Sequence, residues 1–146
     1  MSNTKSDFVG VWKLELYEMR SSNGEKMYPM GPDAQGYIVY TDEGFMSVAI
    51  MKKGRMLFKS NDLTGATTEE KLGAADGYLS YCGLYEVQER QVIHHVKVSL
   101  IPNWIAGDQV RFYEFDGDRL TLSAPFLFGG KEQTARLVWR RLQRTS

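Results

Sequence analysis

Residues 36–51 read GYIVYTDEGFMSVAIM, and this stretch predicts a β-hairpin. Apolar side chains stand at every second position on both sides of a turn at residues 42–44. They are Ile38, Tyr40, Met46, Val48 and Ile50. Because residues two apart in a strand share a face, these side chains predict one apolar face that points into a core. Gly44 supplies the positive φ that the turn needs.

The same period of two continues outward from this hairpin in both directions. Further strands are predicted at residues 9–19, 55–58, 78–88, 92–101, 109–116, 119–123 and 134–142. Residues 62–76 break the pattern and predict one short helix, with a capping box from Thr67 to Glu70 and a stop at Gly77. The long connection at residues 52–77 is a candidate lid over the barrel.

These strands are joined mostly by short turns, so consecutive strands are antiparallel neighbours. Closing such a sheet removes its two exposed edges. We therefore predict an all-β fold, a single antiparallel up-and-down β-barrel of about eight to nine strands, forming one domain over residues 1–146.

Composition narrows the partners and the compartment. The 18 basic and 18 acidic residues cancel, so the chain has no general attraction to nucleic acid. Cys82 is the only cysteine, and no internal disulfide can form. The first residues contain no apolar run typical of a signal peptide, and no stretch predicts membrane insertion. We expect a cytoplasmic protein.

Gly10-Val11-Trp12, at the head of the first predicted strand, resembles the Gly-x-Trp mark of lipocalins and related calycin barrels. In that superfamily a basic residue of the last strand packs on the tryptophan ring and closes the barrel. The resemblance implies this role for Trp12, with Arg140 or Arg141 as its partner.

Further motifs, in their order along nearly the whole chain, resemble the bacterial and fungal lipocalin-like domain family. They are Gly36-x-Ile38-x-Tyr40, Tyr81-x-Gly83-x-Tyr85, His94-His95, Pro102-x-Trp104, Gly107-x-Gln109-x-Arg111 and Asp116-Gly-Asp118. The resemblance implies a lipocalin-like barrel that holds a small molecule. It implies no particular ligand or reaction, because one fold hosts many functions.

Several polar side chains fall on the predicted inward faces. Strand parity predicts that His94 points inward and His95 outward, and that Arg111 and Tyr113 share an inward face. A guanidinium and a phenol side by side can hold one carboxylate through charge-assisted hydrogen bonds. In the alternative, Arg111 is satisfied by an acidic neighbour such as Glu86 or Glu114, or by water.

The candidate ligand-binding residues are Tyr40, Met46, Tyr81, Tyr85, His94, Trp104, Arg111 and Tyr113. In an alternative interpretation these are ordinary core residues without a role in binding, since large aromatic side chains also fill cores that hold no ligand. Trp104 lies in a predicted loop, where it caps the barrel mouth or plugs it. In the first strand, strict alternation sets Trp12 and Leu14 on one face and Tyr17 on the other.

The leading functional hypothesis is a carrier or sensor that binds a small, mostly apolar molecule with a polar or acidic head inside the barrel. One alternative is a cofactor-free isomerase, cyclase or hydratase acting on a natural-product intermediate, with His94, Arg111 and Tyr81 as candidate catalytic residues. Another is a filled structural barrel. No phosphate loop, dinucleotide fingerprint or metal-ligand spacing is present, so we expect neither cofactor nor metal. The sequence is also compatible with a homodimer.

Overall fold

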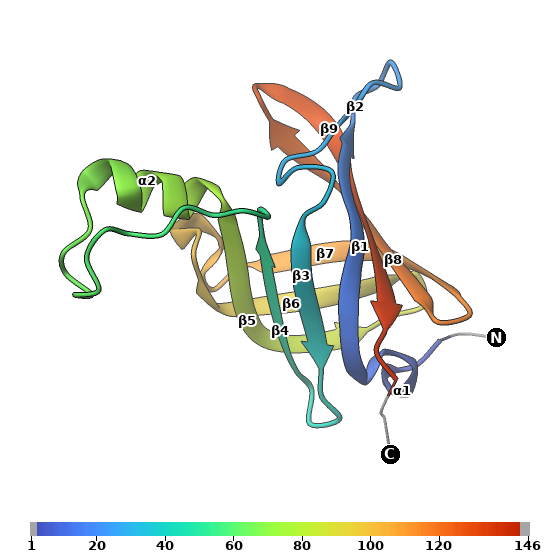
Figure 1. Ribbon diagram of the computed structural model, residues 1–146. Coiled ribbons are helices and arrows are strands. Elements are labelled where there is room, and N and C mark those ends of the chain that lie inside the picture. The colour runs from blue at the N-terminus through green and yellow to red at the C-terminus, as the bar shows by residue number, and fades with distance from the viewer. Residues whose placement is uncertain (1–2, 144–146) are drawn as a thin grey trace.

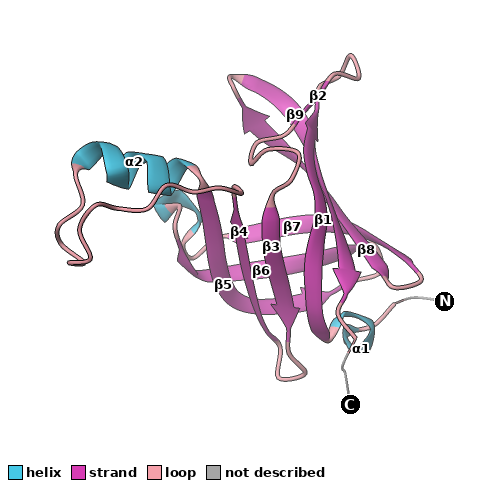
Figure 2. Ribbon diagram, viewed as in Figure 1, coloured by secondary structure: helices cyan, strands magenta, loops and turns pink. Residues whose placement is uncertain are grey.

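A computed structural model describes residues 3–143 as one antiparallel sheet closed into a barrel (Figures 1 and 2). Its strands are β1 (Gly10–Arg20), β2 (Lys26–Met27), β3 (Gln35–Tyr40), β4 (Phe45–Met51), β5 (Tyr78–Val87), β6 (Gln91–Ser99), β7 (Asp108–Asp116), β8 (Arg119–Phe128) and β9 (Lys131–Arg141). The chain runs through the sheet in order, and β9 pairs back onto β1. The predicted up-and-down barrel is confirmed, with β2 as an extra strand on the end of β1.

The two ends of the barrel differ. The tight β3–β4 turn lies at the same end as helix α1 (Lys5–Phe8), which forms a single extra turn of helix before β1 (Figure 1). Gly44 has a φ of +93° in that turn, the left-handed conformation that glycine adopts without strain. The longer connections, with helix α2 (Thr68–Asp76) and the 3-10 turn η1 (Pro102–Trp104), lie at the opposite end. We call these the closed end and the open end.

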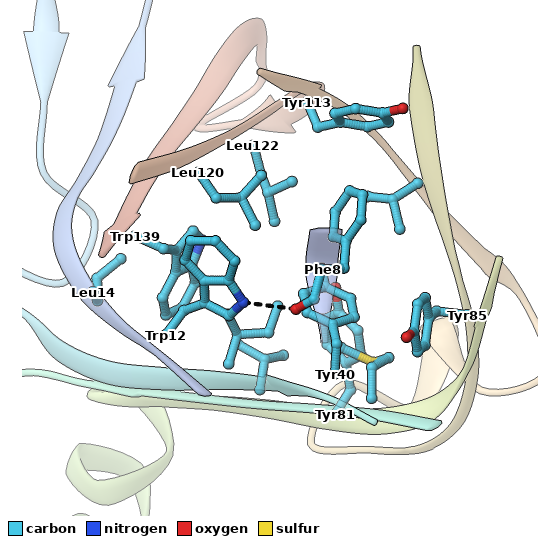
Figure 3. Close-up of a cluster of buried hydrophobic side chains, with 14 of the residues drawn as sticks. Phe8, Trp12, Leu14, Tyr40, Tyr81, Tyr85, Tyr113, Leu120, Leu122 and Trp139 are labelled. Atoms are coloured by element: carbon cyan, nitrogen blue, oxygen red, sulfur yellow. Dashed lines mark hydrogen bonds between the residues drawn. The ribbon is translucent and has the colours of Figure 1, made fainter. Parts of the chain in front are cut away.

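Phe8 and Trp12 seal the closed end. The Phe8 ring is fully buried, and the indole Nε1 of Trp12 donates a hydrogen bond of 2.9 Å to the Phe8 carbonyl (Figure 3). A short helix and the first strand are thereby joined across the base of the barrel. Aromatic rings of this size bury much apolar surface, so the base is a packed core.

Arg141 lies over the Trp12 ring, with its Cζ 4.1 Å from the ring centroid. Its guanidinium also donates to the Val9 carbonyl at 2.7 Å and to the Asp7 carbonyl at 2.5 Å. Gly10 makes room for this arrangement, because a Cβ there would lie 2.7 Å from Arg141 Nη1, and its φ is +138°. The Gly-x-Trp pattern therefore has a physical reason in this chain.

Two β-bulges change the strict alternation. The β1–β9 register shifts between Leu14 and Leu16, so that Tyr17 turns to the inner face. The prediction that Tyr17 lies on the face opposite Trp12 and Leu14 is therefore wrong. A second shift lies in the β5–β6 pairing beside Gly83. Strict parity predicts Val98 on the same face as His94, but Val98 is 65 % exposed.

The segment between β4 and β5 also departs from expectation. Residues 55–58, predicted as a strand, form none, while the capping box of α2 from Thr67 to Glu70 is confirmed. This segment packs mainly on itself, through hydrogen bonds from Arg55 to Ala74 and from Lys59 to Glu70. It projects from the open end beside the barrel instead of covering its mouth (Figure 1).

The last hairpin is longer than predicted. Strands β8 and β9 pair as far as Phe128 and Lys131, beyond the residues that sequence alternation marks as strand. This extension rises above the rim at the open end (Figure 2). Across residues 3–143, none of the helices has the length and apolar character needed to span a membrane.

Candidate functional site

Aromatic side chains fill the half of the barrel next to the closed end, which we call the lower or filled half. The Phe8 ring contacts Tyr40 and Tyr113 edge-on, with centroid distances of 5.2 and 5.0 Å (Figure 3). It contacts Phe115 in the same way, at 4.9 Å. Edge-to-face pairs of this kind each contribute about 0.5–1.5 kcal/mol beyond their buried area. These rings form a packed core at this end of the barrel.

A cavity of about 310 Å³ occupies the upper half, toward the open end. This volume is at the small end of the range of about 300–1,000 Å³ that is typical of ligand sites. Its lining is mostly apolar. The lining residues are Tyr17, Met19, Ile38, Val48, Ile50, Leu79, Tyr81, His94, Ile101, Trp104, Arg111, Leu122, Phe126, Leu127, Phe128, Ala135, Leu137 and Trp139.

Arg111 on β7 is the one charged side chain in that lining, within the residues that the structure describes. It is only 8 % exposed. Its Nη2 donates to Gln109 Oε1 at 2.8 Å and its Nη1 to the Val110 carbonyl at 3.1 Å, and the guanidinium lies 4.7 Å from the Phe126 ring centroid. No carboxylate of residues 3–143 forms an ion pair with it, so neither Glu86 nor Glu114 neutralises this cation.

His94 on β6 joins two phenols in a buried chain of hydrogen bonds. Its Nε2 is 2.7 Å from the Tyr40 hydroxyl, and its Nδ1 is 2.6 Å from the Tyr81 hydroxyl. Burial, followed by the charge of nearby Arg111, holds the pKa of His94 well below its usual value. The imidazole is therefore neutral at pH 7 and carries one ring proton.

The two phenols at the ends of this chain differ in exposure to the cavity. Tyr40 belongs to the filled half, where burial raises the pKa of its hydroxyl well above the usual value. Tyr81 lines the cavity, and burial raises its pKa while the Arg111 charge opposes the shift. Both phenols stay protonated at neutral pH.

Tyr17 and Trp139 bring two further donors to the cavity wall. The Tyr17 hydroxyl makes no hydrogen bond among the described residues, and its pKa is raised by burial and lowered by the Arg111 charge. The indole Nε1 of Trp139 is buried without a partner in the same part of the chain. Unsatisfied buried donors are rare in proteins, because each costs about 1–3 kcal/mol.

The candidate residues from the sequence divide into two sets. Tyr81, His94, Trp104 and Arg111 line the cavity. Trp104 stands at the open end, with its ring 5.8 Å from Tyr81 and 6.2 Å from Phe126 between centroids. Arg111 and His94 face inward, as parity predicts.

Four other candidates, Tyr40, Met46, Tyr85 and Tyr113, do not line the cavity. The Tyr85 hydroxyl donates to the Thr41 carbonyl, and the Tyr113 hydroxyl lies 2.6 Å from the Gln88 carbonyl. The structure therefore does not bring the Tyr113 hydroxyl to the cavity beside Arg111, where the two were predicted to hold one carboxylate. The two side chains share a face, but Tyr113 lies further along β7, inside the filled half.

Sequence reasoning missed Tyr17, which the β1 bulge turns inward. It also missed the apolar residues that the extended β8–β9 hairpin adds near the mouth, Phe126, Leu127 and Phe128. The weak signal for the bulge was the run Leu14-Glu15-Leu16-Tyr17, in which two apolar residues are adjacent. A run of this kind is compatible with several registers.

Outside the barrel, His95 bridges three strands. Its Nδ1 is 2.7 Å from Asp108 on β7, and its Nε2 is 3.0 Å from Glu86 on β5. These hydrogen bonds, with Asp108 the stronger partner, raise the pKa of His95. The two neighbouring histidines thus have opposite environments on opposite faces of one sheet.

Comparison with known proteins agrees with this architecture. A family model described as a lipocalin-like domain matches residues 9–142. A curated protein from Aspergillus oryzae, named 4'-hydroxy-3'-methoxypropiophenone carrier protein, is 36 % identical over 109 residues, which cover 68 % of this chain and 98 % of that protein. Comparison with solved structures gives no significant match.

Proposed function

The chain belongs to the family of lipocalin-like domains, and from that membership we propose that it binds and carries one small, mostly apolar molecule with a polar head. The proposed binding site is the upper cavity, with the head beside Arg111. A carrier needs a cavity of suitable size, an apolar lining and a few polar groups that fix the orientation of the ligand. The cavity described above has these properties.

The observation that carries the proposal is the Arg111 cation, which lies in an apolar cavity and has no carboxylate partner among residues 3–143. Burying a charge without a partner of opposite sign is costly, so an arginine at this position does not contribute to stability as an ion pair does. A ligand oxygen that accepts hydrogen bonds from the guanidinium supplies the missing partner. Arg111 is better explained by binding than by folding.

The relative from Aspergillus oryzae is named for carrying a phenyl ketone with a phenol and a methoxy group. We propose a ligand of similar kind for this chain, a molecule with one aromatic ring and at least one polar oxygen. Trp104 and Phe126 supply flat rings at the mouth against which such a molecule can stack. The small cavity volume also favours a one-ring molecule over a long acyl chain.

An enzymatic function has less support. In the buried chain, both ring nitrogens of His94 are occupied by phenols, which leaves no free nitrogen for general acid or base chemistry on a ligand. Tyr81 and Arg111 remain able to polarise a carbonyl, but the cavity lining, within residues 3–143, offers neither a carboxylate nor a free imidazole nitrogen to remove a proton from the ligand. We propose the cytoplasm as the compartment, because the lone Cys82 requires no oxidising environment.

The test begins with native mass spectrometry of the freshly purified protein, in which a carrier is expected to retain a small molecule. Propiophenone is then titrated into ligand-free protein, with the fluorescence of Trp104 and Trp139 as the signal. The variant Arg111→Met should weaken binding about tenfold or more, because a hydrogen bond from a charged group is worth about 1.5–3 kcal/mol.

The matched control is Arg140→Met, on the outer face of β9 near Glu15. It should bind propiophenone as the wild type does. No co-purified molecule together with no binding of propiophenone or related aromatic ketones would refute the proposal and leave a filled structural barrel.

A further inference from the structure

The polar groups around the cavity are almost all hydrogen-bond donors. Its side-chain lining, within residues 3–143, contains no carboxylate, carboxamide or aliphatic hydroxyl. It contains instead the Arg111 guanidinium, the Tyr17 and Tyr81 hydroxyls, and the indoles of Trp104 and Trp139. The His94 ring also lines the cavity, but both of its nitrogens are engaged by phenols. A phenol can both donate and accept a hydrogen bond. If the Tyr81 proton points into the cavity, Tyr81 acts there as a donor and the site favours a ligand with an acceptor group.

The buried hydrogen bonds that join Tyr40, His94 and Tyr81 restrict the direction in which the Tyr81 proton can point. Neutral His94 has one N–H and one acceptor nitrogen. The two hydrogen bonds of the chain involve three hydrogens: one on each phenol and one on the imidazole. One hydrogen must therefore point out of the chain, from Tyr40 or from Tyr81.

Two arrangements satisfy this count. In the first, Tyr40 donates to Nε2, and Nδ1–H donates to the Tyr81 oxygen, which leaves the Tyr81 proton free. In the second, Tyr81 donates to Nδ1, and Nε2–H donates to Tyr40, which leaves the Tyr40 proton without an acceptor. The Tyr40 side chain is 1 % exposed, among the rings of Phe8 and Tyr85, and its hydroxyl forms no other hydrogen bond in the described part of the chain.

The first arrangement is favoured, because an unmet donor in a packed core is costly whereas a free proton in a cavity can meet a ligand. The free proton of Tyr81 then lies in the part of the cavity that also holds Arg111. The Tyr17 hydroxyl adds another free hydrogen on the wall.

We infer that Tyr40 and His94 orient the Tyr81 proton into the cavity, and that the ligand head is consequently an acceptor oxygen, as in a ketone or a carboxylate, and not an ammonium group. This inference rests on the proposed carrier function and specifies the ligand class of the same site. Tyr40 and His94 act as positioning residues, and Tyr81, Arg111 and Tyr17 contact the ligand head.

The first test measures the tautomer of His94 in the ligand-free wild-type protein by nitrogen-15 NMR of labelled histidine at pH 7. The chain has 2 histidines, and the variant His95→Gln assigns their signals. The expected result is a proton on Nδ1 of His94. A proton on Nε2 would overturn the inference whatever the protein binds.

The second test compares three ligands of matched shape by calorimetry: propiophenone, propylbenzene and 1-phenylpropylamine. Propiophenone should bind most tightly and the cationic amine most weakly. Tyr81→Phe should weaken propiophenone binding about fivefold to tenfold, the effect of one hydrogen bond, and should leave propylbenzene binding within about twofold. A fourth ligand, 3-phenylpropanoic acid, carries a carboxylate. Its affinity relative to that of propiophenone shows whether the site prefers an anionic head or a neutral carbonyl.

Tyr40→Phe provides the sharper comparison, because Tyr40 does not line the cavity. Without its O–H donor, the arrangement that frees the Tyr81 proton loses its advantage. Propiophenone binding should weaken at least threefold, with propylbenzene binding unchanged. The control Tyr37→Phe, on the same strand but 48 % exposed, should alter neither.

The outcomes separate the two proposals. Equal losses for propiophenone and propylbenzene in Tyr40→Phe would indicate a merely structural role and overturn the inference alone. So would tighter binding of the amine than of the ketone. Failure of every compound to bind the wild type would refute the carrier function itself.

Discussion

Replacing Arg141 by alanine should destabilise the closed end of the barrel much more than replacing its neighbour Arg140. Arg141 lies 4.1 Å from the Trp12 ring centroid and donates to two backbone carbonyls, those of Val9 and Asp7. Arg140 points outward, 3.7 Å from Glu15, with about half of its side chain exposed.

The magnitude follows from these contacts. A cation–π interaction at this distance contributes about 1 kcal/mol. The two hydrogen bonds from a partly exposed guanidinium contribute about 1 kcal/mol each. The free energy of unfolding should therefore fall by about 2–4 kcal/mol in Arg141→Ala. At about 3 °C for each kcal/mol in a chain of this length, Tm should fall by about 6–12 °C. An exposed ion pair is worth about 0–1 kcal/mol, so Arg140→Ala should change Tm by about 3 °C or less.

The assay is urea unfolding followed by tryptophan fluorescence, with differential scanning calorimetry for Tm. Arg141→Lys provides a third point, because it keeps the charge but loses the fork of donors, and its stability should lie between those of the wild type and the alanine variant. Propiophenone binding should be unchanged in all three variants, since the cavity lies toward the other end. Equal losses of stability in Arg140→Ala and Arg141→Ala would refute the reasoning.

Three further predictions follow from single contacts. Tyr17→Phe should weaken propiophenone binding about threefold and spare propylbenzene, as measured by calorimetry; an equal effect on both ligands would contradict a role in holding the head. The His95 contribution to stability, from hydrogen bonds with Asp108 and Glu86 that raise its pKa, should be complete below about pH 6.5 and decline as pH rises through the raised pKa. Urea unfolding between pH 5 and pH 9 should show this decline in the wild type and not in His95→Gln. Gly83→Ala should lower the free energy of unfolding by more than about 2 kcal/mol, because the new Cβ would overlap the His95 carbonyl oxygen in the next strand; an unchanged urea midpoint would show that the bulge relaxes at no cost.

Much of the barrel could be predicted from local sequence. Period-two alternation located the eight strands of the closed wall, because one face of each strand is buried. The same parity correctly placed His94 inside and His95 outside. The capping box at Thr67 located the start of α2, since its hydrogen bonds involve only residues close in sequence.

Parity failed where a register shift intervened. The bulge after Leu14 reverses the orientation of Tyr17, and the bulge beside Gly83 exposes Val98. An extra residue in one strand is accommodated by pairing with another strand, so the local sequence pattern gives at most a weak signal of it. The prediction of a strand at residues 55–58 failed for a related reason. Three consecutive apolar residues stand there, but no neighbouring strand pairs with them.

The candidate site was predicted only in part. Composition and parity selected seven residues for the interior, apart from Trp104 in its predicted loop, and the structure divides them between a filled half and a hollow half. That division depends on Phe8, which comes from α1 and meets Tyr40 and Tyr113 across the barrel. Nothing in the spacing of the strand residues reveals which end a helix from elsewhere in the chain will plug.

The sequence by itself determined that this chain is a closed antiparallel barrel with a mostly apolar interior, because alternation and turn residues act through neighbours along the chain. It also determined that an arginine, a histidine and several tyrosines point inward. Only the tertiary structure decided which of them meet. The distances from His94 to two phenols, and the lack of a carboxylate near Arg111 among the described residues, result from strands far apart in sequence that face one another across the barrel. Contacts across a closed sheet depend on register, stagger and closure together, and these are properties of the whole fold.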